Sequence, residues 1–286
     1  MKALLHMQQR STEWLEMRKN KIGASDAPII MGLSPWLTPY QLWEQKVGLQ
    51  GAQAETGAMR RGIEMEDQAR DCFERMTALT VFPQVMIHPD YDWMMASLDG
   101  MDIEQNHIVE IKCAGREDHQ LAKSGKVPEK YYPQLQHQLE VTGLDMVYYF
   151  SYDGSEGVIV EVGRNTRYIW NLVDEERAFH RCVKDFYPPD LSTRDYQEKT
   201  DDVWGEAASE WMKIQKKIHL LESVEKKLRD TLVSMSGGKN SRGGGVRVAK
   251  SIRKGTIDYT KIPELEEVDL DVYRKEPIEV WRIIKE

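Results

Sequence analysis

The segment at residues 107–113 constrains this chain more than any other, because its side chains alternate with the two-residue period of a β-strand. Alternate residues of a strand point to opposite faces of its sheet. One face is apolar and suits a protein core: Val109, Ile111 and Cys113. On the other face Glu110 and Lys112 project side by side. By itself, this pattern is also typical of a half-exposed strand whose polar face is solvated.

A second acidic residue, Asp99, stands before this strand, where the pair Asp99-Gly100 predicts a turn at a strand end. If the two flanking strands pair as a hairpin, the Asp99 carboxylate approaches that of Glu110. Phosphodiester hydrolysis needs one or two hard cations that polarise the phosphate and generate hydroxide, and Mg²⁺ prefers carboxylate oxygens. A lysine beside such a site can orient the attacking water or help to deprotonate it. Asp99, Glu110 and Lys112 therefore predict a metal-dependent phosphodiesterase centre.

A helix expected at residues 57–76 has an apolar stripe that is interrupted by one acidic residue. The stripe consists of Met59, Ile63, Ala69, Phe73 and Met76. Glu66 falls on it, and a buried carboxylate is costly unless a metal or a cation pairs with it. Glu66 is therefore a candidate ligand, although a boundary position whose carboxylate reaches water explains it equally well.

Gln134 and Gln138 pose a similar question on a helix expected at residues 129–142. Both border its apolar stripe, which consists of Tyr131, Leu135 and Leu139. A buried glutamine is polar but uncharged, so a purely structural role explains these two residues more readily than it explains Glu66.

The other patterns predict helices first and then a mixture of strands and helices. Helices are expected at residues 12–20, at 25–32 with Ser25 as the N-cap, from Thr38 with Pro39 in the first turn, and at 117–123 and 166–187. Strands are expected at residues 81–88, 93–98, 146–152 and 158–162. This order predicts an α/β fold with a mixed central sheet flanked by helices.

Beyond about Thr200 the pattern changes to one long amphipathic helix. Its apolar seam is formed by Trp211, Ile214, Ile218, Leu221, Val224, Leu228, Leu232 and Met235. A glycine-rich stretch and a short strand at residues 246–248 follow. We therefore expect two parts: a core at residues 1–200 and a helical C-terminal extension at residues 201–286.

Composition limits the class of protein further. The chain has 286 residues, 41% of them hydrophobic, which is enough to form a substantial core. Its net charge of −8 argues weakly against nucleic acid binding, yet a basic groove can coexist with acidic outer faces. The polar N-terminus and the absence of a long apolar run favour a cytoplasmic protein without a membrane segment.

Five short segments, in this order along the chain, resemble the phage lambda exonuclease family, also called the YqaJ-like viral recombinases, within the PD-(D/E)XK nuclease superfamily. They are W-L-E-M-R and I-G-A-S-D within residues 14–26, R-G-I-E-M-E-D-Q-A-R at 61–70, S-L-D-G at 97–100, V-E-I-K-C at 109–113 and Y-Y-P-Q-L-Q at 131–136. The resemblance extends from about residue 11 to about residue 187.

The resemblance implies roles for the residues of the candidate centre. Asp99 and Glu110 would bind the metal ions together with the backbone carbonyl of Ile111. Lys112 would act on the attacking water, and Glu66 would hold or position a metal. The implied cofactor is Mg²⁺, with Mn²⁺ as a substitute and two ions per site.

Three more residues correspond to positions with roles in this family. Gln134 matches a glutamine that supports the catalytic site. Arg18 matches the arginine that receives the 5′ phosphate, and Ser25 matches a serine that contacts it. A guanidinium can bind a terminal phosphate through two hydrogen bonds, and a helix N-terminus near Ser25 would offer free amides to the same anion.

The function that follows from the resemblance is hydrolysis of double-stranded DNA from 5′-phosphorylated ends, which leaves a 3′ single strand for phage-type recombination. The implied partners are a single-strand annealing protein and further copies of the chain in a closed ring, a trimer. An endonuclease on the same core is the nearest alternative, since the metal ligands do not encode end specificity. A catalytically silent DNA-binding or adaptor module is a second alternative, which the grouped carboxylates and lysine disfavour.

Overall fold

The computed structural model describes residues 3–5, 9, 11–51 and 56–258, together with positions 261–265, 268, 273–275, 278, 280 and 283. The chain divides into two compact units, residues 1–197 and residues 198–286. The division lies three residues from the boundary expected at Thr200.

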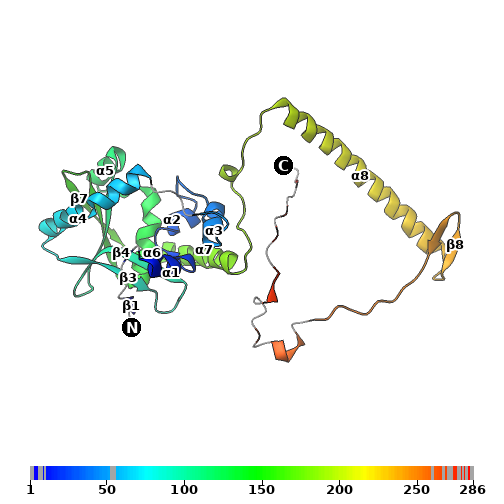
Figure 1. The fold of residues 1–286 in the computed structure, drawn as a ribbon, viewed down its shortest axis with the longest axis horizontal. Coiled ribbons are helices and arrows are strands. Elements are labelled where there is room, and N and C mark those ends of the chain that lie inside the picture. The colour runs from blue at the N-terminus through cyan, green and yellow to red at the C-terminus, as the bar shows by residue number, and fades with distance from the viewer. Residues whose placement is uncertain are drawn as a thin grey trace. The chain divides into compact units, whose positions relative to one another are not determined.

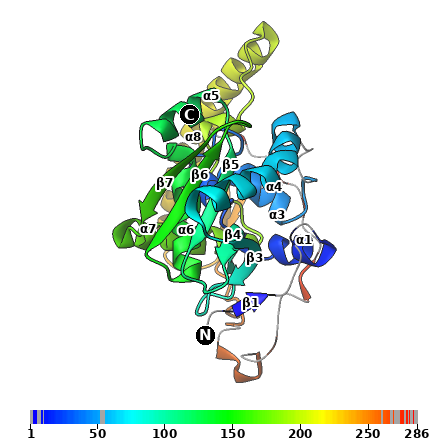
Figure 2. The same ribbon diagram turned by 90° about the vertical axis from the view of Figure 1, so that its left-hand side faces the viewer.

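The first unit, which Figure 1 shows from one side, is built on a mixed sheet whose main order is β1–β3–β4–β5–β6–β7, as the labels of Figure 2 show. The strands are β1 (Ala3–Leu5), β2 (Ile22–Gly23), β3 (Val81–Ile87), β4 (Met94–Asp102), β5 (Ile108–Cys113), β6 (Met146–Tyr152) and β7 (Gly157–Gly163). Strands β5 and β6 are parallel, and the other neighbours in this order are antiparallel. The predicted α/β fold with a mixed central sheet is confirmed, whereas the short strands β1 and β2 were not expected from the sequence.

One edge of β4 is shared by two short pairings. Strand β3 pairs with β4 along almost its whole length, so β2 and β5 both lie on the opposite edge. Strand β2 pairs in parallel with Met94 and Met95, while β5 pairs with Gly100 and Met101. Between these two pairings, residues 96–99 of β4 have no strand beside them on this edge.

Helices cover both faces of the sheet, as Figure 1 and Figure 2 show from two directions. They are α1 (Thr12–Lys19), α2 (Ala27–Ile30), α3 (Pro39–Lys46), α4 (Gly57–Thr77), α5 (Arg116–Lys123), α6 (Tyr132–Thr142) and α7 (Thr166–Lys184). One core contains Ala69 and Phe73 of α4 against β5 and β6. Another contains Leu135 and Leu139 of α6 with residues of α7. Strand β5 is therefore covered on both faces.

Local sequence signals explain where several of these helices begin and end. The Ser11 hydroxyl accepts a hydrogen bond from the Trp14 amide and caps α1. Thr38 and Gln41 form a reciprocal capping box at the start of α3. Gly143 ends α6 with a φ of 66°, a left-handed conformation that favours glycine, so the helix stops after residue 142, as expected from the sequence.

The expected turn at Asp99-Gly100 is wrong, because both residues lie inside β4. Gly100 is needed there for close packing rather than for a turn. A Cβ atom at this position would lie 2.7 Å from side-chain carbons of both Val81 and Val109 on the two neighbouring strands. The chain reverses instead after Asp102, whose carboxylate accepts hydrogen bonds from the amides of Asn106 and His107.

The apolar stripe expected on α4 is only partly correct. Ala69 and Phe73 are fully buried, but Ile63 and Met76 are 39% and 52% exposed. Met65 and Cys72 pack against the core instead. The buried face is therefore rotated from the expected one, and Glu66 lies at its border.

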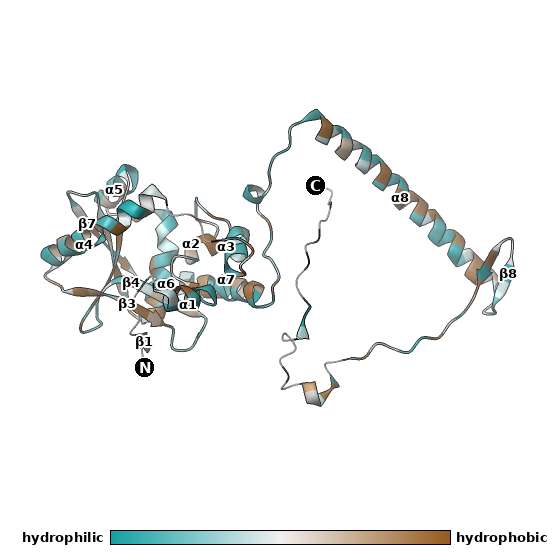
Figure 3. Ribbon diagram, in the orientation of Figure 1, coloured by the Kyte–Doolittle hydropathy of each residue, from teal (hydrophilic) through white to brown (hydrophobic). Residues whose placement is uncertain are grey.

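The second unit contains the 34-residue helix α8 (Asp202–Met235) and a hairpin of β8 (Ser241–Gly243) and β9 (Val246–Val248). The Asp201 carboxylate accepts a hydrogen bond from the Trp204 amide and caps α8. The apolar residues of the expected seam recur along this helix, as Figure 3 shows, and no described residue of α8 is buried within the chain. Nothing among the described helices of either unit is both long enough and apolar enough to cross a membrane.

Candidate active site

The candidate catalytic residues meet where β4 and β5 separate. The strands pair only at Gly100–Val109 and Met101–Ile108, and beyond this point β5 continues beside β6. The Asp99 carboxylate reaches across the gap and accepts a hydrogen bond of 2.8 Å from the Ile111 amide. The amide and carbonyl of one strand residue point to the same edge, so the Ile111 carbonyl faces this gap too. The structure thus brings Asp99, Glu110 and Ile111 together, as the sequence predicts.

Glu110 is buried, with only 2% of its surface exposed. The alternative of a solvated strand face is therefore wrong, because α6 covers this face. The Gln134 amide group donates a hydrogen bond of 2.6 Å to Glu110 Oε1, and that of Gln138 donates to Oε2. Lys112 Nζ donates to Oε1 at 2.5 Å. Gln134 is thus in direct contact with the site, and so is Gln138, which the sequence did not assign to it.

Lys112 lies between an acidic neighbour and an aromatic ring. Its Nζ atom forms a hydrogen-bonded ion pair with Glu110 and lies 5.2 Å from the centroid of the Tyr131 ring. Burial disfavours the charged ammonium, but attraction by Glu110 and Asp99 outweighs it and raises the pKa of Lys112 above its ordinary value. Lys112 is therefore a charged hydrogen-bond donor in the metal-free protein.

The pKa of Asp99 is raised as well, but for a carboxyl group this shift disfavours the charged form. Burial and then the repulsion of Glu110 raise the pKa of Asp99 to about 8, although Lys112 works against this shift. Glu66 adds a smaller repulsion of its own. A cation beside these carboxylates would relieve the repulsion.

Glu66 is connected to Asp99 through an arginine. The Glu66 carboxylate accepts a hydrogen bond of 2.8 Å from Arg70, one helical turn away on α4. The Arg70 Nε atom donates in turn to the backbone carbonyl of Asp99, at 3.1 Å. The structure therefore supports a place for Glu66 beside the centre. Arg70 was missed, although the spacing of four residues between Glu66 and Arg70 on a helix is a recognisable signal.

The donor set fits a hard divalent cation in its chemistry. Asp99, Glu110 and Glu66 offer carboxylate oxygens, and Ile111 adds a backbone carbonyl that faces the same gap. Oxygen donors of this kind suit Mg²⁺ and Mn²⁺. Among the described residues, no three His, Cys, Asp or Glu side chains converge into a complete metal-ligand set. The Glu110 oxygens are instead engaged by Lys112 and the two glutamines, so cation binding requires some of these contacts to change.

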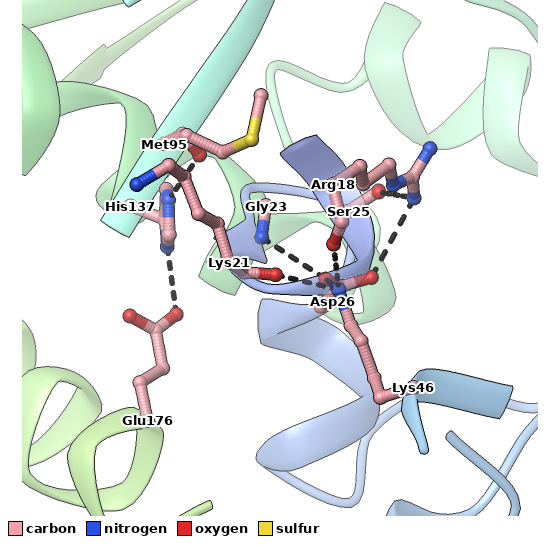
Figure 4. A network of polar contacts seen from close by, with 9 residues as sticks. All are labelled: Arg18, Lys21, Gly23, Ser25, Asp26, Lys46, Met95, His137 and Glu176. Carbon is pink, nitrogen blue, oxygen red and sulfur yellow. Dashed lines mark hydrogen bonds and ion pairs between the residues drawn. The ribbon is translucent and has the colours of Figure 1, made fainter. Parts of the chain in front are cut away.

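Arg18 and Ser25 also lie side by side, as Figure 4 shows. An Arg18 Nη atom donates to the Ser25 hydroxyl at 2.6 Å, and the Arg18 guanidinium lies 5.1 Å from the centroid of the Trp14 ring. The Trp14 indole donates to Ser97 Oγ at 2.9 Å, two residues before Asp99 in β4. This chain of contacts connects the predicted phosphate-binding pair to β4, the strand that carries Asp99.

The expectation that Ser25 caps a helix is wrong. The residue at the N-cap of α2 is Asp26, and it makes no side-chain hydrogen bond to the helix. The helix has four residues, so its N-terminus is too short to act as an anion site. The Ser25 hydroxyl and the Arg18 guanidinium, which also lies 3.5 Å from Asp26 Oδ1, are the groups left to contact a phosphate.

A buried ion pair that the sequence did not reveal holds this region together (Figure 4). Lys46 Nζ lies 2.7 Å from Asp26 and donates to the backbone carbonyls of Arg18 and Lys21. Burial disfavours the Asp26 carboxylate, but Lys46 and Arg18 lower the pKa of Asp26 below its ordinary value. Asp26 also accepts a hydrogen bond from the Gly23 amide. The pair therefore fixes the end of α1, which carries Arg18, against the turn that carries Ser25.

A second buried pair fixes the rotation of α6. His137 Nε2 donates to the Met95 carbonyl of β4 at 2.8 Å, and its Nδ1 atom lies 2.7 Å from Glu176 of α7 (Figure 4). His137 lies between Gln134 and Gln138 on α6. Its two contacts therefore hold the helix in the orientation that directs both glutamines at Glu110.

Comparison with known proteins agrees with this architecture. Residues 13–145 match the model of the YqaJ-like viral recombinase domain. The resemblance to these recombinases that the sequence predicts is thereby confirmed for this part of the chain.

Two relatives add detail. The chain is 34% identical over 134 residues to an uncharacterized protein, YqaJ, of Bacillus subtilis (strain 168), and the alignment covers 46% of this chain and 42% of that protein. The chain therefore spans less than half the length of this curated relative. The chain is also 25% identical, with a TM-score of 0.55, to an alkaline exonuclease (LHK-Exo) from Laribacter hongkongensis, whose structure is also known in complex with dAMP. That alignment covers 62% of this chain and 94% of the exonuclease.

Proposed function

We propose that this chain is a metal-dependent exonuclease that hydrolyses double-stranded DNA from 5′-phosphorylated ends and leaves a 3′ single strand. The observation that carries the proposal is the meeting of Asp99, Glu110 and Lys112 at the gap between β4 and β5. Similarity to an alkaline exonuclease supports the reaction class. Similarity to a viral recombinase domain supports a role in phage-type recombination.

The candidate ligands for two Mg²⁺ ions, or for Mn²⁺ as a substitute, are Asp99, Glu110, Glu66 and the Ile111 carbonyl. Bound there, the metal would supply Lewis-acid polarisation of the scissile phosphate and a water of lowered pKa. Gln134 and Gln138 hold the Glu110 carboxylate in place. The Lys112 ammonium orients the attacking water and offsets the negative charge that develops in the transition state.

End specificity is assigned to Arg18 and Ser25. A guanidinium can bind a terminal phosphate through two hydrogen bonds, and the Ser25 hydroxyl next to it adds a third donor. The buried ion pair between Lys46 and Asp26 holds Arg18 and Ser25 in place. An enzyme that cuts within the duplex does not need to bind a terminal phosphate, so Arg18 and Ser25 favour an exonuclease over an endonuclease on the same core.

The proposal includes partners. A single-strand annealing protein would take up the exposed 3′ strand. Further copies of the chain would form a closed ring, a trimer, because a head-to-tail interface must close to avoid filaments. A ring would also allow basic side chains to line a DNA channel while the acidic excess of the chain faces outward.

A digestion assay tests the reaction and its polarity. Linear duplexes with 5′-phosphate or 5′-hydroxyl ends and a closed circle are incubated with Mg²⁺, Mn²⁺ or EDTA. We expect metal-dependent release of mononucleotides, fastest from phosphorylated ends, and no release by Lys112→Ala. Equal cutting of both linear duplexes and the closed circle would establish the endonuclease instead. DNA binding without hydrolysis in any metal would establish a silent binding module.

A further inference from the structure

A cavity of about 290 Å³ opens at the carboxyl ends of the parallel strands β5 and β6. Arg61 of α4 and Arg116 of α5 line it from two sides, and His119 of α5 and Asp153 after β6 line it as well. Cys113 also borders it and directly follows Lys112 in β5. The cavity therefore lies at the end of β5, the strand that carries Glu110 and Lys112, and its lining includes neither Arg18 nor Ser25.

The two arginines give this cavity a positive character. Both are exposed, and within the described ranges neither Arg61 nor Arg116 forms an ion pair or a hydrogen bond. Other arginines of this unit, such as Arg70 and Arg164, are paired with carboxylates. Two unpaired guanidinium groups beside one cavity leave their donors available to an anion.

His119 provides a buried donor at the same place. Its side chain is only 3% exposed, and its Nδ1 atom lies 2.9 Å from Ser151 Oγ. Its Nε2 atom is buried and has no hydrogen-bond partner among the described residues. The nearest carboxylate, Asp153 Oδ2, lies 3.6 Å away, which is too long for a hydrogen bond. This carboxylate favours the tautomer with the proton on Nε2, so that Nδ1 accepts from Ser151.

The start of α5 adds backbone donors. Gly115 is its N-cap and supplies no side-chain hydrogen bond to the first amides of this eight-residue helix. Gly115 and Arg116 both line the cavity. The free amides and the positive end of the helix dipole therefore add to the attraction of an anion.

We propose that this cavity binds a phosphate group of a nucleotide next to the scissile bond. The proposal rests on the proposed nuclease function and names a second phosphate contact for the same substrate. Arg61 and Arg116 hold the phosphate by charge-assisted hydrogen bonds, while His119 Nε2 and the amides of α5 donate to it. The phosphate belongs either to the DNA strand or to a released mononucleotide.

The test compares an Arg61→Ala/Arg116→Ala double variant with wild type and with Arg167→Ala, an exposed arginine of α7 outside the cavity. Binding of a 5′-phosphorylated duplex is measured by fluorescence anisotropy at several KCl concentrations, with Ca²⁺ in place of Mg²⁺. Each phosphate contact contributes about 0.9 to the slope of log K against log salt. We expect the double variant to lose about 0.9 from this slope, while Arg167→Ala keeps the wild-type slope. Thermal unfolding confirms that all variants are folded.

A second arm measures inhibition of digestion by dAMP. A strand phosphate in the cavity lowers the salt slope and leaves dAMP inhibition unchanged, whereas a released mononucleotide there weakens dAMP inhibition and leaves the slope unchanged. Either result supports the phosphate site. An unchanged slope together with unchanged dAMP inhibition overturns it. A wild-type protein that digests no DNA refutes the proposed function instead, so the two failures are distinguishable.

Discussion

The Asp99 carboxylate accepts a hydrogen bond of 2.8 Å from the Ile111 amide across the gap between β4 and β5. This contact takes the place of the next backbone hydrogen bond between the two strands, because the Asp99 side chain accepts the bond that a β4 carbonyl would otherwise accept. It also holds the Asp99 carboxylate close to that of Glu110, and the two carboxylates repel each other.

Asp99→Asn is expected to abolish hydrolysis and to stabilise the metal-free protein at alkaline pH. The pKa of an unfolded Asp is about 3.9, whereas that of folded Asp99 is about 8. Between these pH values the unfolded chain binds fewer protons than the folded protein does. The free energy of unfolding of wild type in EDTA therefore falls as pH rises through this window. Urea denaturation at several pH values measures the effect. A stability difference between wild type and Asp99→Asn that does not change from pH 4 to pH 8 would contradict it.

Glu66→Gln is expected to raise the Mg²⁺ concentration needed for half-maximal activity by about 10–100-fold, since residues that orient metal ligands have effects of this size. The substitution keeps the shape and removes the charge that faces Arg70 and Asp99. Glu64→Gln, an exposed position on the same helix, is the matched control. If both variants respond to Mg²⁺ as wild type does, Glu66 is a structural residue at the border of α4.

Arg18→Ala is expected to remove the preference for 5′-phosphorylated ends. A hydrogen bond to a charged group contributes about 1.5–3 kcal/mol, so the KM for phosphorylated ends should rise by roughly 10–100-fold. The KM for 5′-hydroxyl ends should change little, and metal-dependent cleavage should persist. Lys19→Ala, an exposed neighbour on α1, controls for the loss of a positive charge. A uniform effect on both kinds of end would assign Arg18 to general DNA binding.

Lys46→Met is expected to destabilise the fold by about 3–5 kcal/mol, because it leaves the buried Asp26 carboxylate without its main partner. Lys46→Met combined with Asp26→Asn should recover part of this loss, because neither charge then remains buried. Urea denaturation gives both values. A loss below about 1 kcal/mol in the single variant would mean that Arg18 alone neutralises Asp26.

Deletion of residues 201–286 tests the role of α8 in assembly. Its apolar side chains, among them Ile214 at 47% and Leu228 at 60% exposure, would favour association if they stayed uncovered. If α8 holds the proposed ring together, light scattering will show a trimer for the full chain and a smaller species for the truncated one. Processive digestion in the presence of a DNA trap should be lost with the ring. If the truncated chain still forms the trimer and still digests DNA processively, α8 is assigned instead to recruitment of the annealing partner.

Much of the first unit could be predicted from local patterns. The alternation in β5, the cap of α3 and the glycine that ends α6 each depend on neighbouring residues alone, so their positions are correct. The clearest error falls where distant segments meet. Asp99-Gly100 has the composition of a turn, but Val81 and Val109 leave room only for a glycine at position 100, inside a strand.

The sequence by itself determined most of the helices and strands, though not β1 and β2, and the chemistry of Asp99, Glu110 and Lys112, because periodicity and residue type are local properties. Only the tertiary structure decided which groups surround them. The burial of Glu110 depends on α6, the connection of Glu66 to Asp99 depends on Arg70, and the position of Arg18 at the end of α1 depends on Lys46. These contacts join residues that are distant in the chain, and their free energies depend on burial and distance, which no local pattern records.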